Sequence, residues 1–567
     1  MSFDIGGLLP PRARCVAELG CGRGEAGAAF LRVQPEADYW GFAPDSREAR
    51  EAAGRLPHAC CLQPGNTDFA AFGLYQADAV ALRGPYLSLL GQEGGLRPLA
   101  DLLTEEGQLL VEMPNPAYLP GVLSALSGQG AQQSFSLERL QAALAEAGLY
   151  SVQVLARQDS QGDQALRTSP ELAAFLPALE KLMAGPGGGR EPGNLWVREW
   201  FVRAMKRPVA PEQELRLHTL LGERIATPRV RVLEPDSFLR TEPGVSTAVE
   251  SGKLSLDADK GISQRILIRQ RLSYDSPAQG LSFIEAVRRQ GYTIVAEMDD
   301  NPSLWRDRDA KNHLEGLNYL GSHGVQVSTE PLAEVMRRWN PHVKVLRNEL
   351  RELPPPRDYR EEKAVTVFFG ALNRSEDWQE IMPVLNEAAA RYGEGLRFKV
   401  LSDRKFFEAL KTPCKEFIGT EQDYGGQFVP YEVYCRTLRS ADIALLPLHD
   451  TEFNRTKSDL KFIESAGHGA VALASPTVYA ATLRDGRTGF LYHNPQEFAQ
   501  RLRLLIEDRE RRLETAAAAY RYVREERLLA QHYGERLAWY RELIARREEL
   551  DRELTQRLQR WQEERKA

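Results

Sequence analysis

Short apolar runs alternate with amphipathic stretches along most of the chain. Residues 442–448 (DIALLPL) are an apolar run with the length of a strand buried on both faces, and residues 460–466 carry apolar side chains at helical spacing. The same alternation of strand and helix patterns runs from residue 264 to residue 348 and begins again at residue 365. Such alternation predicts an α/β protein with parallel, doubly wound, Rossmann-like sheets.

Ligands of parallel sheets bind in the crevice beyond the carboxyl ends of the strands. Asp299, Asp300 and Asn301 follow one predicted strand, and Ser328 and Thr329 follow the next one and open a helix. We therefore expect these residues at a crevice, although a solvated turn is the alternative for the two aspartates.

Three stretches depart from the alternation. Residues 167–208 have a helical pattern with a Gly-rich break, GPGGG, which predicts helices around a flexible linker. Residues 229–233 are a candidate strand. The stretch after residue 526 is dense in charges of both signs, and its leucines follow heptad-like spacing only briefly, so we expect a solvated helix there.

The 567 residues leave room for several domains. We predict an α/β domain over residues 1–160, a helical linker over 161–210, two α/β halves over 211–355 and 356–525, and a charged C-terminal helix over 526–567. The run Pro354 to Pro356 marks the linker between the two halves.

Composition narrows the class of protein. Hydrophobic residues make up 43% and charged residues 27% of the chain, as in soluble proteins, and the net charge of -6 does not favour nucleic acid or an anionic membrane as a partner. There is no signal-peptide pattern and no apolar run long enough for a membrane span. The six cysteines form no CxxC pair and the histidines have no metal-binding spacing, so we expect a cytoplasmic protein without a metal.

A Gly-rich turn follows the first predicted strand, in the sequence ELGCGRG. Gly20, Gly22 and Gly24 let the backbone pass close to a ligand, and the next helix offers unpaired N–H groups. With Glu18 before the glycines, the pattern resembles motif I of class I methyltransferases. The resemblance extends over residues 1–160, and it implies that these four residues contact S-adenosylmethionine.

One position differs from that family. The acidic residue that grips the cofactor ribose at the end of the second strand is replaced by Ala43, and Asp45 lies two residues later. Either Asp45 takes over this contact or the cofactor site is degenerate. Glu112, Pro114 and Asn115 are candidate lining residues of the same site, or simply the end of a strand.

Lys457, Lys461 and Glu464 lie three or four positions apart, so we expect them on one face of a helix near its N-terminus. Ammonium groups at a positive helix end suit a diphosphate, and a carboxylate one turn later suits ribose hydroxyls. The order of this helix, the following GHGAVALAS and DGRTGF resembles the nucleotide-sugar half of GT-B glycosyltransferases of the family-4-like group. This family usually has another Glu eight residues before the one that corresponds to Glu464, and this chain has Thr456 at that place. Asp450 and Glu452 are nearby but at a different spacing.

The same resemblance implies roles for other residues. Gly370 ends a strand, and the loop after it, with Asn373 and Arg374, is expected to meet the donor diphosphate. Asp300 is the candidate general base on the acceptor side, and no metal is expected. Whether the anomeric configuration is retained or inverted stays open.

The order of the two units resembles bacterial fusion proteins that decorate flagellin or surface polysaccharide. It implies transfer of a sugar from a nucleotide-sugar donor to a protein hydroxyl, such as a flagellin Ser or Thr, or to a glycan, with methylation of the sugar as a partner reaction. Two alternatives remain. The N-terminal domain can be a non-catalytic docking module, or the whole chain can be a scaffold for glycan assembly.

Overall fold

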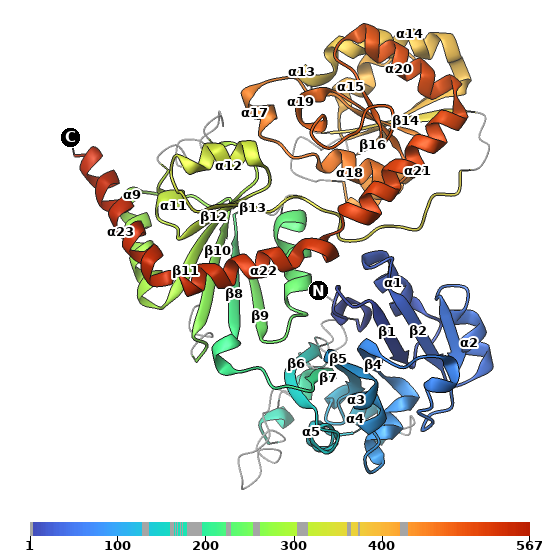
Figure 1. The fold of residues 1–567 in the computed structure, drawn as a ribbon, viewed down its shortest axis with the longest axis vertical. Coiled ribbons are helices and arrows are strands. Elements are labelled where there is room, and N and C mark those ends of the chain that lie inside the picture. Colours follow the sequence, from blue (N-terminus) through green and yellow to red (C-terminus); the bar gives the residue numbers. More distant parts are fainter. Residues whose placement is uncertain are drawn as a thin grey trace. The chain divides into compact units, whose positions relative to one another are not determined.

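The structure is a computed structural model, and it divides into two compact units (Figure 1). Unit 1 comprises Met1–Gln213 and Thr241–Gly244, and unit 2 comprises Glu214–Arg240 and Val245–Ala567. The residues it describes are 4–127, 135–158, 164, 166, 168–170, 172, 174–178, 195–222, 228–252, 261–302, 316–359, 364–371, 375–419 and 429–566. The fold is α/β, as the sequence pattern predicted.

Unit 1 is built on a sheet that has seven strands in the described ranges, in the order β3-β2-β1-β4-β5-β7-β6. Strand β7 is antiparallel to both of its neighbours, and the other pairs are parallel. The strands are β1 (Cys15–Leu19), β2 (Asp38–Ala43), β3 (His58–Cys61), β4 (Ala77–Leu82), β5 (Leu103–Pro114), β6 (Tyr150–Gln158) and β7 (Val197–Met205), and the helices are α1 (Glu25–Val33), α2 (Ser46–Ala52), α3 (Arg97–Leu102), α4 (Leu119–Leu126) and α5 (Leu137–Glu146).

The helical prediction for residues 197–205 is wrong, because this stretch is strand β7. Its apolar residues fit helical spacing as well as a buried strand, and a short apolar run cannot distinguish the two. Pairing with β5 on one side and β6 on the other decides the outcome. Phe201, only 1% exposed, and Trp200 are buried there.

Unit 2 contains two parallel sheets, each of six strands among the described residues. The first half has the order β13-β12-β11-β10-β8-β9, and the second half has the order β16-β15-β14-β17-β18-β19. The strands of the first half are β8 (Leu215–Leu221), β9 (Val245–Ser251), β10 (Gln264–Gln270), β11 (Tyr292–Met298), β12 (Gly324–Val327) and β13 (Val343–Val345). Those of the second half are β14 (Val365–Gly370), β15 (Leu396–Leu401), β16 (Lys415–Ile418), β17 (Ile443–Leu446), β18 (Val471–Ala474) and β19 (Phe490–Leu491).

The helices of unit 2 cover the faces of these sheets. The first half contains α8 (Glu234–Leu239), α9 (Pro277–Arg289), α11 (Leu317–Leu320) and α12 (Glu330–Arg337). The second half contains α13 (Ser375–Trp378), α14 (Met382–Tyr392), α15 (Arg404–Ala409), α16 (Tyr431–Arg439), α17 (Glu452–Arg455), α18 (Leu460–Gly467), α19 (Pro476–Tyr479), α20 (Pro495–Glu507) and α21 (Arg509–Glu526).

The strand expected at residues 229–233 is a π-helix, Arg229–Leu233. Alternation over five residues is too short to fix a strand. The side chain of Arg231 decides the local structure, because it is buried and its Nε donates to Glu297 at 2.7 Å while its Nη1 donates to Asn348 at 2.9 Å.

The last two helices, α22 (Leu529–Ala545) and α23 (Arg547–Glu564), return to the first half of unit 2 (Figure 1). The prediction of a solvated helix is therefore wrong for α23. Leu550, Leu554, Leu558 and Trp561 form one apolar stripe, and all four side chains are buried. The charges on the remaining faces of α23 conceal this stripe in the sequence.

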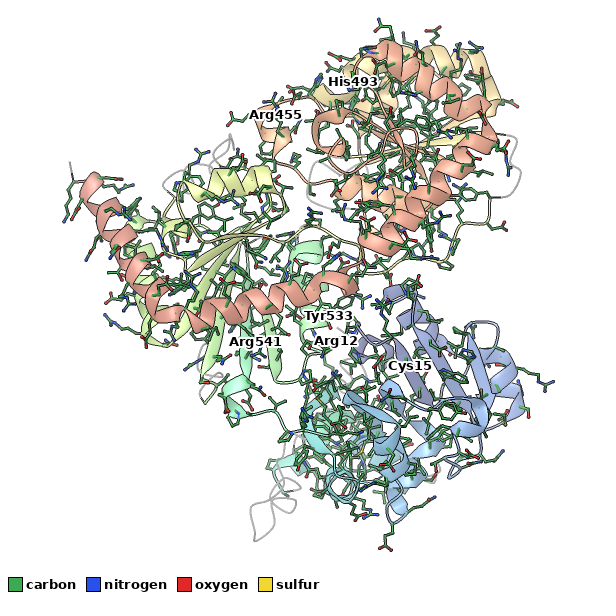
Figure 2. All side chains as sticks on the ribbon, viewed as in Figure 1. Arg12, Cys15, Arg455, His493, Tyr533 and Arg541 are labelled. Carbon is green, nitrogen blue, oxygen red and sulfur yellow. The ribbon has the colours of Figure 1, made fainter. Side chains whose placement is uncertain are left out.

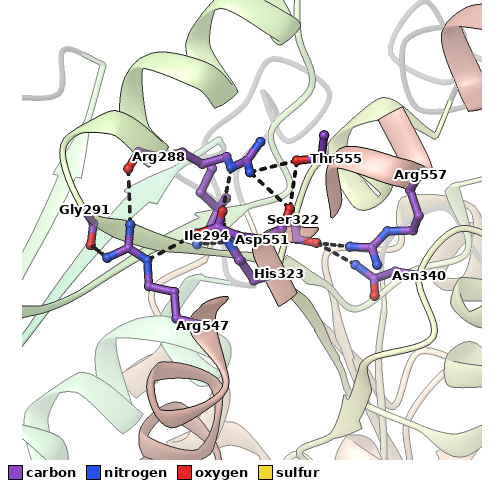
Figure 3. Close-up of polar contacts among 10 residues, drawn as sticks. All are labelled: Arg288, Gly291, Ile294, Ser322, His323, Asn340, Arg547, Asp551, Thr555 and Arg557. Carbon is purple, nitrogen blue, oxygen red and sulfur yellow. Dashed lines mark hydrogen bonds and ion pairs between the residues drawn. The ribbon is translucent and has the colours of Figure 1, made fainter. Parts of the chain in front are cut away.

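Polar contacts fix α23 to the same half (Figure 3). Asp551 accepts hydrogen bonds from Arg288 Nε at 2.6 Å and from His323 Nε2 at 3.0 Å. His323 Nδ1 in turn accepts from the backbone N–H of Ile294 at 2.8 Å, so the ring is neutral with its proton on Nε2. Arg557 donates to the carbonyl oxygen of Ser322 at 2.8 Å. In the described part of the chain, no helix combines the length and apolar character that crossing a membrane requires.

Candidate functional site

The carboxyl ends of β10 and β11 bring three charged side chains together. Arg271 directly follows β10, and Asp299 and Asp300 directly follow β11, which pairs with β10 in parallel register. Arg271 Nη2 lies 2.9 Å from Asp300 Oδ2, and its Nε lies 3.5 Å from Asp299 Oδ1. Burial raises the pKa of Asp299, Arg271 opposes this shift, and the charges of Glu297 and Asp300 add to it.

Lys457 completes this cluster from the second half of unit 2. Its Nζ lies 2.9 Å from Asp300 Oδ1 and 4.3 Å from the centre of the Phe453 ring. Lys457 does not belong to α18, as the spacing had suggested, but lies in the bend three residues before that helix. The structure thus joins the predicted phosphate-binding cation and the predicted base in one ion pair.

Lys461 and Glu464 lie together one turn into α18. Glu464 is 3% exposed, and its carboxylate accepts hydrogen bonds from Tyr434 Oη at 2.8 Å and Tyr431 Oη at 3.1 Å. Lys461 Nζ lies 3.7 Å from the same carboxylate and 4.1 Å from the centre of the Tyr434 ring. Burial and the Glu464 charge raise the pKa of Tyr434 far above its ordinary value. These two residues share a face as predicted, while Lys457 points elsewhere.

The segment 456–459 is held residue by residue. The backbone carbonyl of Thr456 accepts from Thr329 Oγ1 at 2.7 Å, so Thr456 serves as an attachment point between the two halves. The remaining contacts are Lys457 with Asp300 at 2.9 Å, Ser458 Oγ with Asn348 Nδ2 at 2.8 Å, and Asp459 with Arg527 Nη1 and Nη2 at 2.6 and 2.9 Å. Thr329, Asp300 and Asn348 all belong to the first half, so this segment connects the two halves of unit 2.

A cleft of about 910 Å³ borders this segment. Thr329 and Arg347 line it from the first half, and Arg455, Lys457 and Thr477 line it from the second half. Arg455, at the end of α17 (Figure 2), is exposed and pairs with Asp450 at 2.5 Å. The volume is that of a small-molecule site.

The other predicted donor-site residues surround β14. Gly370 is its last residue, and a Cβ atom at this position would come within 2.4 Å of the Phe368 ring, so the strand end requires glycine. Asn373 and Arg374 lie outside the described residues. Within the described ranges, no group of three or more His, Cys, Asp or Glu side chains is arranged to hold a metal ion.

In unit 1, the Gly-rich turn joins β1 to α1. Gly20, Gly22 and Gly24 all have positive φ, at 94°, 55° and 84°, which non-glycine residues rarely adopt. A Cβ atom on Gly20 would meet the carbonyl oxygen of Arg83 at 2.5 Å, and one on Gly24 would meet Leu56 at 3.0 Å. No atom lies within 4 Å of the corresponding position at Gly22, so this glycine faces open space.

Glu18 is fully buried at the carboxyl end of β1. It accepts a hydrogen bond from Tyr39 Oη at 2.8 Å and lies 3.7 Å from Arg83 Nη1. Burial raises the pKa of Glu18 to about 7, although Arg83 and the Tyr39 hydrogen bond both oppose the shift. Its carboxyl group thus bonds to Tyr39 on β2 and lies near Arg83, which directly follows β4.

Asp45 caps α2. Its Oδ1 accepts from the backbone N–H groups of Glu48 at 3.0 Å and Arg47 at 2.8 Å, and these bonds lower the pKa of the carboxyl group. Ala43, at the end of β2, is buried. The carboxylate proposed to compensate for Ala43 is thus also the N-cap of a helix.

The sequence named Glu112 as a candidate lining residue but missed Arg83, Arg157 and Glu199, which form a row of charges with it beside this turn. Arg83 Nη1 lies 3.3 Å from Glu112 Oε2, Arg157 Nη2 lies 3.8 Å from Glu112 Oε1, and Arg157 also pairs with Glu199. Arg83, Glu112 and Glu199 line a cavity of about 440 Å³. The signal that could have found Arg83 is its charge directly after strand β4. The same signal, a charge directly after a strand, would have found Arg271.

A family model described as glycosyl transferase-like matches residues 383–539. No curated protein matches the chain.

Among solved structures, TarM of S. aureus is similar at 12% identity, with 49% of this chain and 55% of that chain covered and a TM-score of 0.37. A glycosyltransferase from Rickettsia africae is also similar at 12% identity, covering 58% of this chain and 99% of that one, with a TM-score of 0.42. HepE of Anabaena, in complex with UDP and glucose, has 11% identity over 57% of this chain and 98% of that one, with a TM-score of 0.39. The chain spans little more than half the length of TarM.

Proposed function

We propose that unit 2 is a GT-B glycosyltransferase that uses a nucleoside diphosphate sugar. The observation that carries the proposal is the position of Lys457, whose ammonium group is fixed at the carboxyl edge of two parallel sheets in a chain that matches a glycosyl transferase-like family over residues 383–539. The cleft next to Lys457 has the volume for such a donor.

In the proposed reaction, a hydroxyl oxygen of the acceptor attacks the anomeric carbon of the sugar. The bond from that carbon to the β-phosphate oxygen breaks, and its electron pair leaves with the nucleoside diphosphate. Lys457 neutralises the developing charge, a role in which Arg374 and Lys461 would assist. Asp300 is the group proposed to accept the hydroxyl proton.

Of the residues proposed to contact the donor, Lys457 lines the cleft directly. The ribose contact predicted for Glu464 stays a prediction, since in this structure both tyrosine hydroxyls already occupy the carboxylate. The proposed acceptor is a protein hydroxyl, such as a flagellin Ser or Thr, or a surface glycan, and the proposed location is the cytoplasm. Both rest on the sequence resemblance and composition.

The test is release of sugar from a panel of UDP-, GDP- and dTDP-linked sugars by the full chain. Lys457→Ala should lower turnover by about a hundredfold or more, because one cation that stabilises the leaving group is lost. Lys411→Ala, which removes an exposed lysine on the loop before β16, is the matched control and should turn over normally. Wild-type turnover by Lys457→Ala would show that the donor site lies elsewhere, and no binding of any donor would favour the scaffold alternative.

A second function is favoured by the glycine turn of unit 1. We propose that this turn binds S-adenosylmethionine. The strand order of the sheet, the three glycines with positive φ and the open space beside Gly22 support this proposal. Methylation of the transferred sugar is the proposed reaction of this unit. The alternative is a docking module that binds no cofactor, which the capping role of Asp45 would allow.

Calorimetric titration of the full chain with S-adenosylmethionine distinguishes these two alternatives. Gly22→Val should abolish binding, since its side chain would fill the open space, and Gly148→Val is the control. Gly148 also has positive φ and open space around it, but it lies between α5 and β6. Binding that survives Gly22→Val would place the cofactor elsewhere, and no binding by the wild-type chain would identify unit 1 as a docking module.

A further inference from the structure

Arg271 has an unusual backbone conformation. Its φ is 52°, and among the residues that the structure describes only Ser402 shares a positive φ without being glycine. The backbone N–H of Arg271 donates to the Glu297 carbonyl at 3.0 Å, and its own carbonyl oxygen lies 2.6 Å from the position that a Cβ atom on Gly222 would occupy. Such a conformation is strained and is kept only where the surroundings enforce it.

The side chain shows what this conformation achieves. Leaving β10 in the left-handed region, Arg271 directs its guanidinium to both aspartates that follow β11, at 2.9 Å from Asp300 and 3.5 Å from Asp299. The side chain of Arg271 is 11% exposed and that of Asp300 is 22% exposed. Charges that are this well covered interact more strongly than charges on the surface.

Asp300 is shared between two cations. Its Oδ2 pairs with Arg271 of the first half, and its Oδ1 pairs with Lys457 of the second half, each at 2.9 Å. The cluster of Arg271, Asp299, Asp300 and Lys457 therefore contains two cations and two carboxyl groups, and burial raises the pKa of Asp299. Because Arg271 takes up part of the Asp300 charge, the attraction of Asp300 for the Lys457 ammonium group is limited.

We propose that Arg271 is a positioning residue of the transfer site, which fixes Asp299 and Asp300 and, through Asp300, aims the ammonium group of Lys457 at the donor diphosphate. The inference rests on the proposed glycosyl transfer and adds to it a residue that neither the sequence motifs nor the comparisons point to. Without Arg271, Asp300 pairs with Lys457 alone and draws its ammonium group away from the phosphates.

The test combines two variants in one cycle. Arg271→Gln should lower kcat by roughly tenfold to a hundredfold, since a small displacement of a catalytic group has effects of this size. In the background of Lys457→Ala, the same substitution should have no further effect on kcat or on the affinity for UDP, GDP or dTDP, whichever of these binds. Arg271→Lys keeps the charge but loses the two-pronged geometry, so it should restore only part of the activity.

The pH profile provides a readout that a purely structural ion pair would not change. The groups that act on Asp299 are Arg271, Glu297, Asp300 and Arg231, and Asp300 also pairs with Lys457. Losing the Arg271 cation disfavours the charged carboxylates, so the acid limb of the kcat profile should move to higher pH in Arg271→Gln.

The outcomes separate the two proposals. The control is Arg289→Gln, because Arg289 is an exposed residue of α9 that pairs with Glu285. This variant should match the wild-type chain in all assays. An Arg271→Gln chain that melts like the wild type, with wild-type kcat and pH profile, would overturn the positioning role, and so would effects that add to those of Lys457→Ala. If the wild-type chain itself neither binds nor consumes any donor, the proposed function fails first and the role of Arg271 fails with it.

Discussion

At the scale of single residues, Glu464 is a charge enclosed by aromatic side chains. Its two carboxylate oxygens accept hydrogen bonds from Tyr434 and Tyr431, and Lys461 lies 3.7 Å away. A buried carboxylate is stable only with such partners, because burial removes its hydration. The hydroxyls of two tyrosines on α16 thus maintain a negative charge on α18.

Tyr434→Phe should therefore lower the free energy of unfolding of unit 2 by about 1.5 to 3 kcal/mol, the usual cost of losing a hydrogen bond to a charged group in a buried site. Tyr392→Phe is the matched control, since its hydroxyl donates to exposed Glu507 at 2.6 Å. Urea unfolding followed by circular dichroism measures both variants. Equal, small losses would mean that water replaces the hydroxyl of Tyr434.

The residues of the candidate site were predicted only in part. The sequence identified Asp300 by its place after a predicted strand and Lys457 by its helical spacing to Lys461 and Glu464, but it did not show that they touch, because 157 positions separate them. Arg271 escaped notice for a related reason. Its importance comes from a backbone angle and from two partners on another strand, and none of these leaves a local pattern.

At the scale of elements, α23 shows how a helix with few apolar residues can belong to a core. Four buried side chains along one stripe pack on the first half of unit 2, and Asp551 adds polar contacts with Arg288 and His323 (Figure 3). Burial alone would raise the pKa of Asp551, but the hydrogen bonds from His323 and Arg288, together with the charge of Arg288, lower it to about 2.

Asp551→Asn should destabilise the docking of α23 by about 1 to 2 kcal/mol, a moderate value because solvent reaches the pair and screens it. Glu549→Gln, on an exposed face of the same helix, is the control and should leave stability unchanged. Thermal melts of both variants give the comparison. A melting temperature for Asp551→Asn equal to that of the wild type would mean that the apolar stripe alone holds the helix.

The same aspartate gives a pH dependence with a defined sign. Since the folded-state pKa is depressed, the stabilisation is complete above the ordinary pKa of Asp, about 4, and is lost as the pH falls through about 2. The loss on acidification from pH 5 to pH 2 should therefore be smaller in Asp551→Asn than in the wild-type chain.

Elements with strong, repeated patterns were predicted correctly, and isolated ones were not. Strands β10 to β18 of unit 2 follow from apolar runs between helices, whereas β8, β9 and β19 were not predicted. Residues 197–205 and 229–233 were misassigned because a short apolar stretch fits more than one periodicity and distant partners decide between them. For β7 those partners are β5 and β6, and for the π-helix the partners of Arg231 decide.

At the scale of the whole molecule, the alternation of strands and helices predicted the α/β class and the parallel sheets. It did not predict the order of strands within a sheet, since that order depends on which crossovers the chain makes. Nor did it predict that the segment 456–459 connects the two halves of unit 2, because each of its four contacts joins residues far apart in sequence.

The return of α22 and α23 to the first half also sets an order for synthesis. The last strand of the unit 1 sheet, β7, ends at residue 205, so this sheet can form while the ribosome is still translating the rest of the chain. The first half of unit 2, by contrast, has its last sheet strand at residue 345 but waits for Leu554, Leu558 and Trp561 to cover its core. During that interval its apolar face is open to chaperones or to neighbouring nascent chains, although its own strands are already complete.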